Sequence, residues 1–227
     1  MHVDEAIRSR KSVRRFLPTP VPESVVRHVL NVSARAPSGN NVQPWRVYVL
    51  AGEPRSRFCD AMLAAAAADP DCHQPEYAYY PTTWVEPYLE RRRRCGFGLY
   101  ATLGIARDDK AARERQMMRN YSFFDAPVGL LVTLDRRLNT GSFMDVGMFI
   151  QNIMVAARAQ GLHTCAQAAF AWFHRVAREQ LPMSDEEILV CGIALGHEDL
   201  QAPENAFITE RAEAGEFASF HGFAPAA

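Results

Sequence analysis

No stretch of this 227-residue sequence reaches the roughly 18 uninterrupted apolar residues that a membrane-spanning helix needs, so no membrane partner is expected. Net charge is almost absent, because 25 basic residues face 26 acidic ones, and no overall field attracts nucleic acid. The five cysteines are scattered and contain no C-x-x-C pair, which argues against a disulfide framework. Without a secretory signal at the start, the sequence predicts a cytoplasmic protein.

Several catalytic and nucleotide-binding motifs are missing as well. The sequence has no G-x-G-x-x-G and no G-x-x-x-x-G-K-[ST], so neither a Rossmann-type nor a P-loop phosphate site is predicted. H-E-x-x-H and G-x-S-x-G are also absent, which argues against a zincin and an ordinary serine hydrolase. His163 and Cys165 lie two positions apart, and two potential ligands do not make a metal site. We therefore predict no metal.

Apolar and aromatic residues are plentiful enough for one sizeable core. Hydrophobic residues make up 48% of the chain and charged residues 22%, as in an average globular domain. Runs of β-branched and aromatic residues predict strands at 45–51, 127–134 and 188–195, the last of them central in a sheet. Helical spacing and proline or glycine boundaries predict helices over 23–36, from 52 onward, and over 90–103, 108–120, 142–161 and 173–180. The pattern favours one layered domain of helices and strands, residues 1–227.

Two predicted capping boxes mark expected element starts. Ser142 and Asp145 have the S-x-x-D spacing before an amphipathic run, and Ser184 and Glu187 have the S-x-x-E spacing before the strand at 188–195.

Two segments lack a secondary-structure period of their own. Residues 69–87 combine four prolines with clustered aromatic residues, and a long proline-interrupted segment in a compact domain is usually a lid or a binding loop. The tail after Gly196 carries Phe207, Phe217, Phe220 and Phe223 without helical or strand spacing. Such aromatic residues need a surface to cover them, and we favour a second subunit over the parent domain.

Residues 8–12 are the first candidate binding site. Three cations and two hydroxyls within Arg8-Ser9-Arg10-Lys11-Ser12 could grip one phosphate, because the guanidinium fork matches phosphate oxygens and serine adds neutral hydrogen bonds. A solvated helix end explains the same residues equally well.

Three further segments allow both a functional and a structural interpretation. The amides of Asn40, Asn41 and Gln43 could bind the edge of a flat heterocycle, or belong to a plain turn before the strand. The small residues of 161–168 would let the backbone approach a planar ligand, or form only a helix-to-strand crossover. The four arginines at 91–94 are best explained as a solvated helix face, with a rim for an anionic substrate or the phosphates of NADPH as the alternative.

Taken together, these segments resemble the FMN-dependent nitroreductase family. The resemblance rests first on the spacing of two blocks, Arg8-Ser9-Arg10 through Arg14-Arg15-Phe16 and Ala36-Pro37-Ser38 with Asn41-x-Gln43-Pro44-Trp45. Later pieces follow in the family's order: Ala156-Ala157-x-x-x-Gly161-Leu162, a crossover with Gln167, a strand ending at Gly196, and Arg211 in the tail. The resemblance spans nearly the whole chain and implies an α+β fold, with a layered sheet flanked by helices.

The resemblance also implies a homodimer with FMN sites at the interface and a tail, about 200–227, that wraps the partner subunit. The residues it assigns to the FMN phosphate and ribityl chain are Arg8, Ser9, Arg10, Ser12 and Arg211. Those it places on the isoalloxazine from the partner subunit are Pro37, Ser38, Gly39 and Asn41, and those at the other edge, near N5, are Ala166, Gln167 and Ala168. Some family members carry proline where this sequence has Ala166.

The activity implied by the resemblance is reduction of nitroaromatic compounds, including nitrobenzoate-like ones, by NAD(P)H in ping-pong hydride transfer through flavin N5. No catalytic side chain is required, because the cofactor carries the chemistry. A segment of about 69–105 resembles the long insertion of such members, with a small aromatic acceptor held by Tyr79, Tyr80, Trp84 and Tyr88. The alternatives are another acceptor on the same flavin, through reductive dehalogenation or quinone or enone reduction, and a non-catalytic flavin-binding protein. Nucleic-acid binding is disfavoured by the near-zero net charge.

Overall fold

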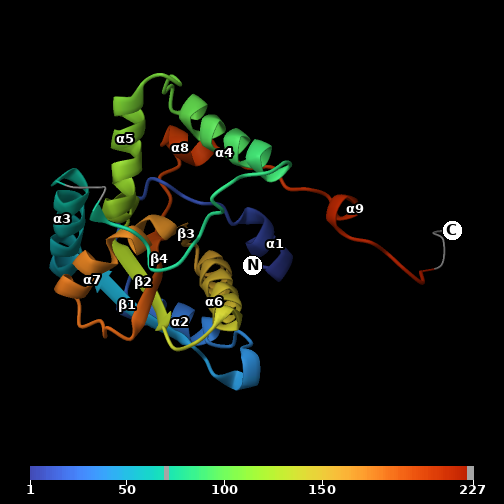
Figure 1. The fold of residues 1–227 in the computed structure, drawn as a ribbon, viewed down its shortest axis with the longest axis horizontal. Helices are drawn as coiled ribbons and strands as arrows, with labels where there is room; N and C mark the ends of the chain where they lie inside the picture. The colour runs from blue at the N-terminus through green and yellow to red at the C-terminus, as the bar shows by residue number, and fades with distance from the viewer. Residues whose placement is uncertain (69–71, 224–227) are drawn as a thin grey trace.

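A four-stranded antiparallel sheet in the order β1-β2-β4-β3 forms the centre of the molecule (Figure 1). The computed structural model of the chain describes residues 1–68 and 72–223. The strands are β1 (Trp45–Ala51), β2 (Val128–Asp135), β3 (His163–Gln167) and β4 (Glu187–Gly196). The predicted strands at 45–51, 127–134 and 188–195 are confirmed, and β4 is an interior strand as expected. β3 is an additional strand in the crossover that follows Gly161.

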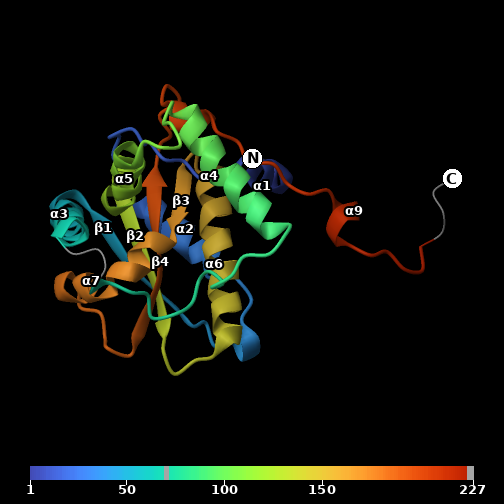
Figure 2. The same cartoon turned by 45° about the horizontal axis from the view of Figure 1, so that its top comes forward.

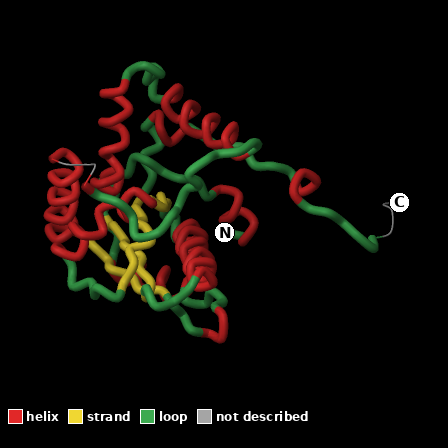
Figure 3. Tube along the Cα trace, viewed as in Figure 1, coloured by secondary structure: helices red, strands yellow, loops and turns green. Residues whose placement is uncertain are grey.

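Helices cover both faces of this sheet, which makes the fold α+β as predicted (Figures 2 and 3). The helices, with η marking the 3-10 type, are α1 (Val3–Ser9), α2 (Glu23–Ser33), η1 (Gly39–Asn41), α3 (Gly52–Ala68), α4 (Tyr88–Thr102), α5 (Lys110–Met118), η3 (Arg119–Asp125), α6 (Thr140–Ala159), η4 (Ala168–Phe173), α7 (His174–Gln180), α8 (Pro203–Ala206) and α9 (Ala214–Phe217). None of the helices in the described ranges is long and apolar enough to cross a membrane.

Two apolar layers explain this arrangement. On one face of the sheet, α2 and α6 bury Val29, Phe149 and Ile153 against β2 and β4. On the other face, α3, η3, η4 and α7 form a second core that includes Phe58 and Phe170. β2 is buried on both faces along nearly its whole length, which is why its sequence is a continuous apolar run rather than an alternating one.

The capping boxes predicted from spacing are wrong. α6 begins at Thr140, so Ser142 and Asp145 lie inside the helix, and the Asp145 carboxylate accepts a hydrogen bond of 3.3 Å from the N–H of Gly39 instead. No helix follows Ser184 either. The Glu187 carboxylate accepts from the N–H of Ser184 at 3.2 Å and begins β4. In both pairs the acidic side chain makes a hydrogen bond, but not as a helix cap.

The tail divides into a docked part and an extended part. Asn205 is buried and joins the tail to the N-terminal segment: its side chain accepts from the N–H of Arg14 at 2.8 Å and donates to the carbonyl of Arg15 at 2.8 Å. Phe207 packs so closely on Gly98 of α4 that a Cβ there would lie 2.5 Å from the ring. Phe207 therefore contacts its own domain, which corrects the expectation that a second subunit covers it.

Beyond Arg211 the tail leaves the body of the molecule (Figure 1). Phe217, Phe220 and Phe223 are exposed by 64% or more of their surface. The last predicted part of the tail, 224–227, lies outside the described residues, as do residues 69–71 at the start of the predicted lid segment.

Candidate functional site

The end of α1 runs directly onto the outer edge of β3. α1 ends at Ser9, and three residues later Ser12 forms a β-bridge with Thr164 of β3. The N–H of Val13 donates a hydrogen bond of 3.1 Å to the carbonyl of Thr164. Residues 8–12 are thereby held beside β3 by backbone bonds.

Positive charge is concentrated where residues 8–12 meet the tail at Arg211, and we call this place the Arg10 corner. Arg10 is half-buried, and burial, followed by the nearby Arg211, lowers its pKa. The Arg211 guanidinium donates to the carbonyl of Thr209 at 3.2 Å, to its hydroxyl at 2.6 Å and to the carbonyl of Glu210 at 2.8 Å. Within the described ranges, no carboxylate pairs with Arg10 or Arg211. Two neighbouring guanidiniums without a counter-charge favour an anion, and their fork geometry suits phosphate.

Ser9 is held by a residue that the sequence did not single out. Arg158, in the last turn of α6, donates from Nε to the Ser9 hydroxyl at 3.2 Å and from a terminal nitrogen to the carbonyl of Leu162 at 3.0 Å. A lone arginine at a helix C-terminus ordinarily indicates only a favourable interaction with the helix dipole. No sequence signal linked Arg158 to Ser9.

Lys11 does not join the other cations of residues 8–12. Its Nζ lies 2.6 Å from the buried carboxylate of Glu198 and donates to the carbonyl of Asn205 at 2.6 Å. The three-cation grip expected from the sequence is therefore reduced to Arg8 and Arg10, with Arg211 supplied by the tail. Arg8 stands exposed in the last turn of α1.

His163 faces the same Glu198 carboxylate as Lys11. Its Nε2 lies 3.1 Å from Glu198, yet burial first, and then Arg158, Lys11 and His197, lower its pKa to about 4. We infer a neutral imidazole that faces the carboxylate, because Lys11 already neutralises Glu198. Among the described residues, no group of three or more histidine, cysteine, aspartate or glutamate side chains could hold a metal ion.

Of the predicted residues Ala166, Gln167 and Ala168, the first two end β3 and Ala168 begins η4. Alternate residues of a strand turn their N–H and C=O to the same edge. Since the Thr164 carbonyl faces the N-terminal segment, the backbone groups of Ala166 face that same outer edge, and Ala166 is exposed. The Gln167 side chain points inward, where its Nε2 donates to the carbonyl of Asn120 at 2.8 Å. This edge therefore offers Ala166 backbone groups, not a glutamine amide, to a flat ligand.

The predicted turn of Pro37, Ser38, Gly39 and Asn41 is built from unusual backbone. Asn40 and Asn41 adopt φ angles of 47° and 58°, a left-handed region that asparagine tolerates better than most residues. The Ser38 hydroxyl closes the turn by accepting from the N–H of Gln43 at 3.0 Å. A small cavity of about 240 Å³ opens here, bordered by Arg35, Pro37, Asn41 and Gln43 among others.

Within one chain, the turn at 37–41 lies far from the Arg10 corner. The turn is tied to Asp145 near the start of α6, whereas Ser9 is tied to Arg158 near its end. At 1.5 Å per residue, these two attachment points are about 20 Å apart along the helix axis. The two halves of the predicted site therefore lie at opposite ends of α6.

The predicted acceptor residues Tyr79, Tyr80 and Trp84 form a chain of ring contacts that starts at Tyr77. Ring centroids are 6.3 Å apart for Tyr77–Tyr79, 4.6 Å for Tyr79–Tyr80 and 5.7 Å for Tyr80–Trp84. The fourth predicted residue, Tyr88, begins α4 and is 57% exposed. In the described residues its ring makes no such contact, so the structure joins three of the four.

Two anchors that the sequence did not predict hold this segment to the body. The Glu76 carboxylate contacts Arg136 at 2.7 Å and Arg178 at 3.0 Å, and these arginines lower its pKa although burial opposes them. The Tyr77 hydroxyl donates to the carbonyl of Val190 at 2.5 Å. Val190 lies where the β2–β4 register shifts, which leaves it without a partner in β2.

The sequence model of the Nitroreductase family matches residues 7–197, most of the chain. The chain belongs to the nitroreductase family. The family assignment made from the two N-terminal blocks is therefore confirmed. The matched range includes residues 8–12, the turn at 37–41 and β3, and it ends before the tail that carries Arg211.

Similar proteins cover almost the full length. The chain is 42% identical over 218 residues to nitrobenzene nitroreductase of Ectopseudomonas oleovorans, covering 96% of each. It is 43% identical over 210 residues to 4-nitrobenzoate reductase of Nocardioides sp., covering 92% of this chain and 85% of that protein. A crystal structure of the FMN- and NADPH-dependent nitroreductase NfnB from Sphigopyxis sp. strain HMH superposes with a TM-score of 0.95 at 37% identity, over 98% of this chain and 100% of that one.

Proposed function

We propose that this nitroreductase-family protein is an FMN-dependent NAD(P)H oxidoreductase that reduces nitroaromatic compounds. The observation that carries the proposal is the pair Arg10 and Arg211, whose guanidiniums lie near enough for Arg211 to lower the pKa of Arg10 and which pair with no carboxylate among the described residues. This corner suits the phosphate of FMN, because it supplies two planar donors and the hydroxyls of Ser9 and Ser12 beside them. Relatives at 42% and 43% identity are named for the reduction of nitrobenzene and of 4-nitrobenzoate.

The chain's own residues would bind and orient the cofactor. Arg8, Ser9, Arg10, Ser12 and Arg211 would hold the phosphate and ribityl chain, while the outward backbone of Ala166 would meet the ring edge. When bound, FMN supplies hydride transfer between NAD(P)H and an aromatic acceptor, so no acid–base side chain is needed. Arg158 would act only indirectly, by orienting the Ser9 hydroxyl.

The arrangement along α6 supports a homodimer. The turn at 37–41 lies about 20 Å along α6 from the Arg10 corner of its own chain. We therefore propose that it lines the flavin of the partner subunit. The exposed Phe217, Phe220 and Phe223 would be covered by the partner, with the tail beyond Arg211 crossing to it. Each subunit would supply its turn and its tail to the other, which fits the two-fold symmetry that most homodimers adopt.

The aromatic chain from Tyr77 to Trp84 supports a role in acceptor binding. Its base is fixed by Glu76 and Tyr77, while Tyr79 and Tyr80 are each 59% exposed. We propose that Tyr79, Tyr80, Trp84 and Tyr88 form one wall for a flat acceptor. Deleting 79–88 would then raise the KM for the acceptor while the protein keeps its FMN, whereas unchanged acceptor kinetics would remove this role.

We place the protein in the cytoplasm. No disulfide joins cysteines in the described ranges, and Cys165 and Cys191 are buried, as fits a compartment that keeps thiols reduced. Fractionation of the native host, with the protein followed by antibody, tests this placement.

The proposed function is tested by an absorbance spectrum of the purified protein before and after anaerobic addition of NADPH or NADH. We expect a yellow protein whose flavin bands bleach with at least one donor and return on addition of 4-nitrobenzoate or nitrobenzene. Flavin that stays oxidised with both donors would point to a flavin-binding protein without reductase activity. A colourless protein that does not take up added FMN would refute the proposal altogether.

A further inference from the structure

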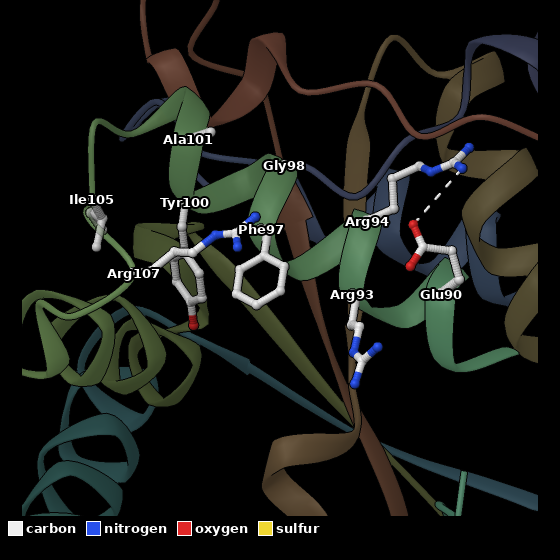
Figure 4. A pocket seen from close by; sticks show the side chains of 9 residues that line it. All are labelled: Glu90, Arg93, Arg94, Phe97, Gly98, Tyr100, Ala101, Ile105 and Arg107. Carbon is white, nitrogen blue, oxygen red and sulfur yellow. Dashed lines mark ion pairs between the residues drawn. The ribbon is translucent and has the colours of Figure 1, made fainter. Parts of the chain in front are cut away.

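A cavity of about 670 Å³ opens beside α4 and the turn that follows it (Figure 4). The side chains of Arg93, Phe97, Tyr100, Ile105 and Arg107 are among those that line it. Its volume lies within the range of small-molecule pockets in proteins, about 300–1,000 Å³. The cavity combines aromatic faces with cations, which is an unusual lining for a purely apolar ligand.

The cations of this cavity are not balanced by nearby carboxylates. Glu90, which lines the cavity, and Glu210, which does not, both pair with Arg94, at 4.0 Å and 2.6 Å. In the part of the chain that the structure describes, no carboxylate pairs with Arg93 or Arg107. Figure 4 shows Arg94 turned toward Glu90, while Arg93 and Arg107 project from other positions around the cavity. Two positive charges therefore stay available to a ligand.

Arg107 is also positioned for binding. Its Cζ lies 4.3 Å from the centroid of the Phe97 ring, a cation–π contact that fixes the guanidinium plane beside the aromatic lining. This contact leaves the edge N–H groups of the guanidinium free to donate. A guanidinium held in this way loses less conformational entropy when an anion binds.

The cavity is linked to the Arg10 corner through the ion pair of Arg94 with Glu210. Arg94 lines the cavity and pairs with Glu210, the residue next to Arg211, which in turn lies near Arg10. Phe207 packs on Gly98 of the same helix and fixes the path of the tail between the two places. A ligand in the cavity would therefore lie close to the phosphate end of the cofactor site.

We propose that this cavity binds an aromatic group that carries a negative charge, with its ring against Phe97 and Tyr100 and its charge toward Arg93 and Arg107. The proposal rests on the proposed function, since it names the chemistry of one of the two substrates. In the proposed reaction, that group is the adenosine 2′-phosphate part of NADPH, because a nitroarene must lie against the flavin ring to be reduced and is assigned above to the wall of Tyr79, Tyr80, Trp84 and Tyr88. NADPH is therefore preferred over NADH.

The test compares each charged substrate with a matched one that lacks the charge. Arg107→Met keeps the apolar stem against Phe97 and removes the cation, and Arg91→Met is the control on an exposed arginine of α4 that does not line the cavity. KM values are measured for 4-nitrobenzoate and nitrobenzene with one donor, and for NADPH and NADH with one acceptor. We expect Arg107→Met to raise the KM for NADPH by about tenfold, the effect of one charge-assisted hydrogen bond. The KM values for NADH, 4-nitrobenzoate and nitrobenzene, and all values for Arg91→Met, should stay within about twofold of the wild type, well short of that loss.

Each outcome decides the proposal. A selective effect on NADPH supports the proposal, whereas a selective effect on 4-nitrobenzoate would overturn it. Equal shifts for charged and uncharged substrates, or no shift in either pair, would overturn the proposal.

A binding measurement separates this inference from the proposed function. Calorimetric titration of the FMN-loaded protein with 4-nitrobenzoate, and separately with adenosine 2′-phosphate, measures occupancy without turnover. Binding of adenosine 2′-phosphate that weakens in Arg107→Met supports the site even if no NAD(P)H is oxidised, in which case only the proposed function has failed. A wild-type protein that turns over substrates but does not bind adenosine 2′-phosphate refutes the site alone.

Discussion

The hydroxyl of Tyr77 donates a hydrogen bond of 2.5 Å to the carbonyl of Val190, the residue at which the pairing of β2 and β4 shifts register. An irregularity in the sheet thus becomes the attachment point of a segment that carries Tyr79, Tyr80 and Trp84. The burial around this bond raises the pKa of Tyr77, so the phenol stays protonated and remains a donor throughout the ordinary pH range.

Tyr77→Phe removes this hydrogen bond and leaves the carbonyl of Val190 without its partner. We expect a loss of about 1–2 kcal/mol in the free energy of unfolding. For a chain of this size, that corresponds to a fall in Tm of about 2–8 °C. The KM for a nitroaromatic acceptor should rise as well, because the aromatic chain loses its base. Thermal melts and initial-rate kinetics measure the two effects. Tyr79→Phe is the control, and an equal loss of Tm in that variant would contradict the role given to the Tyr77 hydroxyl.

Arg10→Gln tests the proposal that the Arg10 corner binds the phosphate of FMN. The glutamine keeps a polar side chain but removes the charge, so FMN binding should weaken by about 1.5–3 kcal/mol, roughly 10- to 150-fold in Kd. Titration of the apoprotein followed by flavin fluorescence gives the Kd directly. Arg27→Gln is the matched control, because Arg27 pairs with Glu23 on an exposed helix face. Should both variants bind FMN as the wild type does, the anion would have to lie elsewhere.

His163 should make stability depend on pH in a defined window. Its pKa in the folded protein is about 4, below the value of about 6.5 expected in the unfolded chain. Between these values the unfolded state binds more protons, so stability falls as the pH is lowered from about 6.5 to about 4. His163→Gln should flatten this part of the Tm-versus-pH curve, and the exposed His28→Gln should leave it unchanged. Parallel curves for all three proteins would show that His163 is not the titrating group.

Gly192→Ala should destabilise the core beside β4. A Cβ at this position would overlap the ring of Phe170, which is fully buried between β4 and its neighbours. Overpacking of this kind costs about 1–3 kcal/mol. Gly96→Ala in α4 has open space around the new Cβ and should stabilise the protein slightly, by up to about 1 kcal/mol, through helix propensity. Urea denaturation of both variants measures the two signs, and a stability of Gly192→Ala equal to the wild type would refute the close packing.

The sequence predicted those elements whose signal is local. Strand β1 was predicted at 45–51, its observed bounds, because β-branched and aromatic residues fill it and glycine and proline follow. β3 has only five residues and little apolar alternation, so it was visible only as a crossover. Its place in the sheet comes from pairing with β4 and from the bridge of Ser12 to Thr164, neither of which is encoded in its own residues.

The candidate site shows the same division between local and long-range information. Family resemblance placed Arg10 and Arg211 in one site although 200 positions separate them in the sequence, and the structure brings their charges together. Resemblance did not find Arg158 or the diversion of Lys11 to Glu198. These contacts depend on which buried carboxylate or hydroxyl each cation reaches after folding. The spacing of Asp145 suggested a helix cap, but tertiary structure gave that carboxylate the N–H of Gly39 instead.

The Arg10 corner combines residues that lie far apart in the sequence, Arg10 and Arg211. Asn205 ties the tail that carries Arg211 to Arg14 and Arg15, next to the segment that carries Arg10. The corner is therefore complete only when the segment around residue 211 has docked against the segment around residue 10. Fusions or truncations at either end would act on the same site, so a tag at the N-terminus and a shortened C-terminus are expected to share one defect.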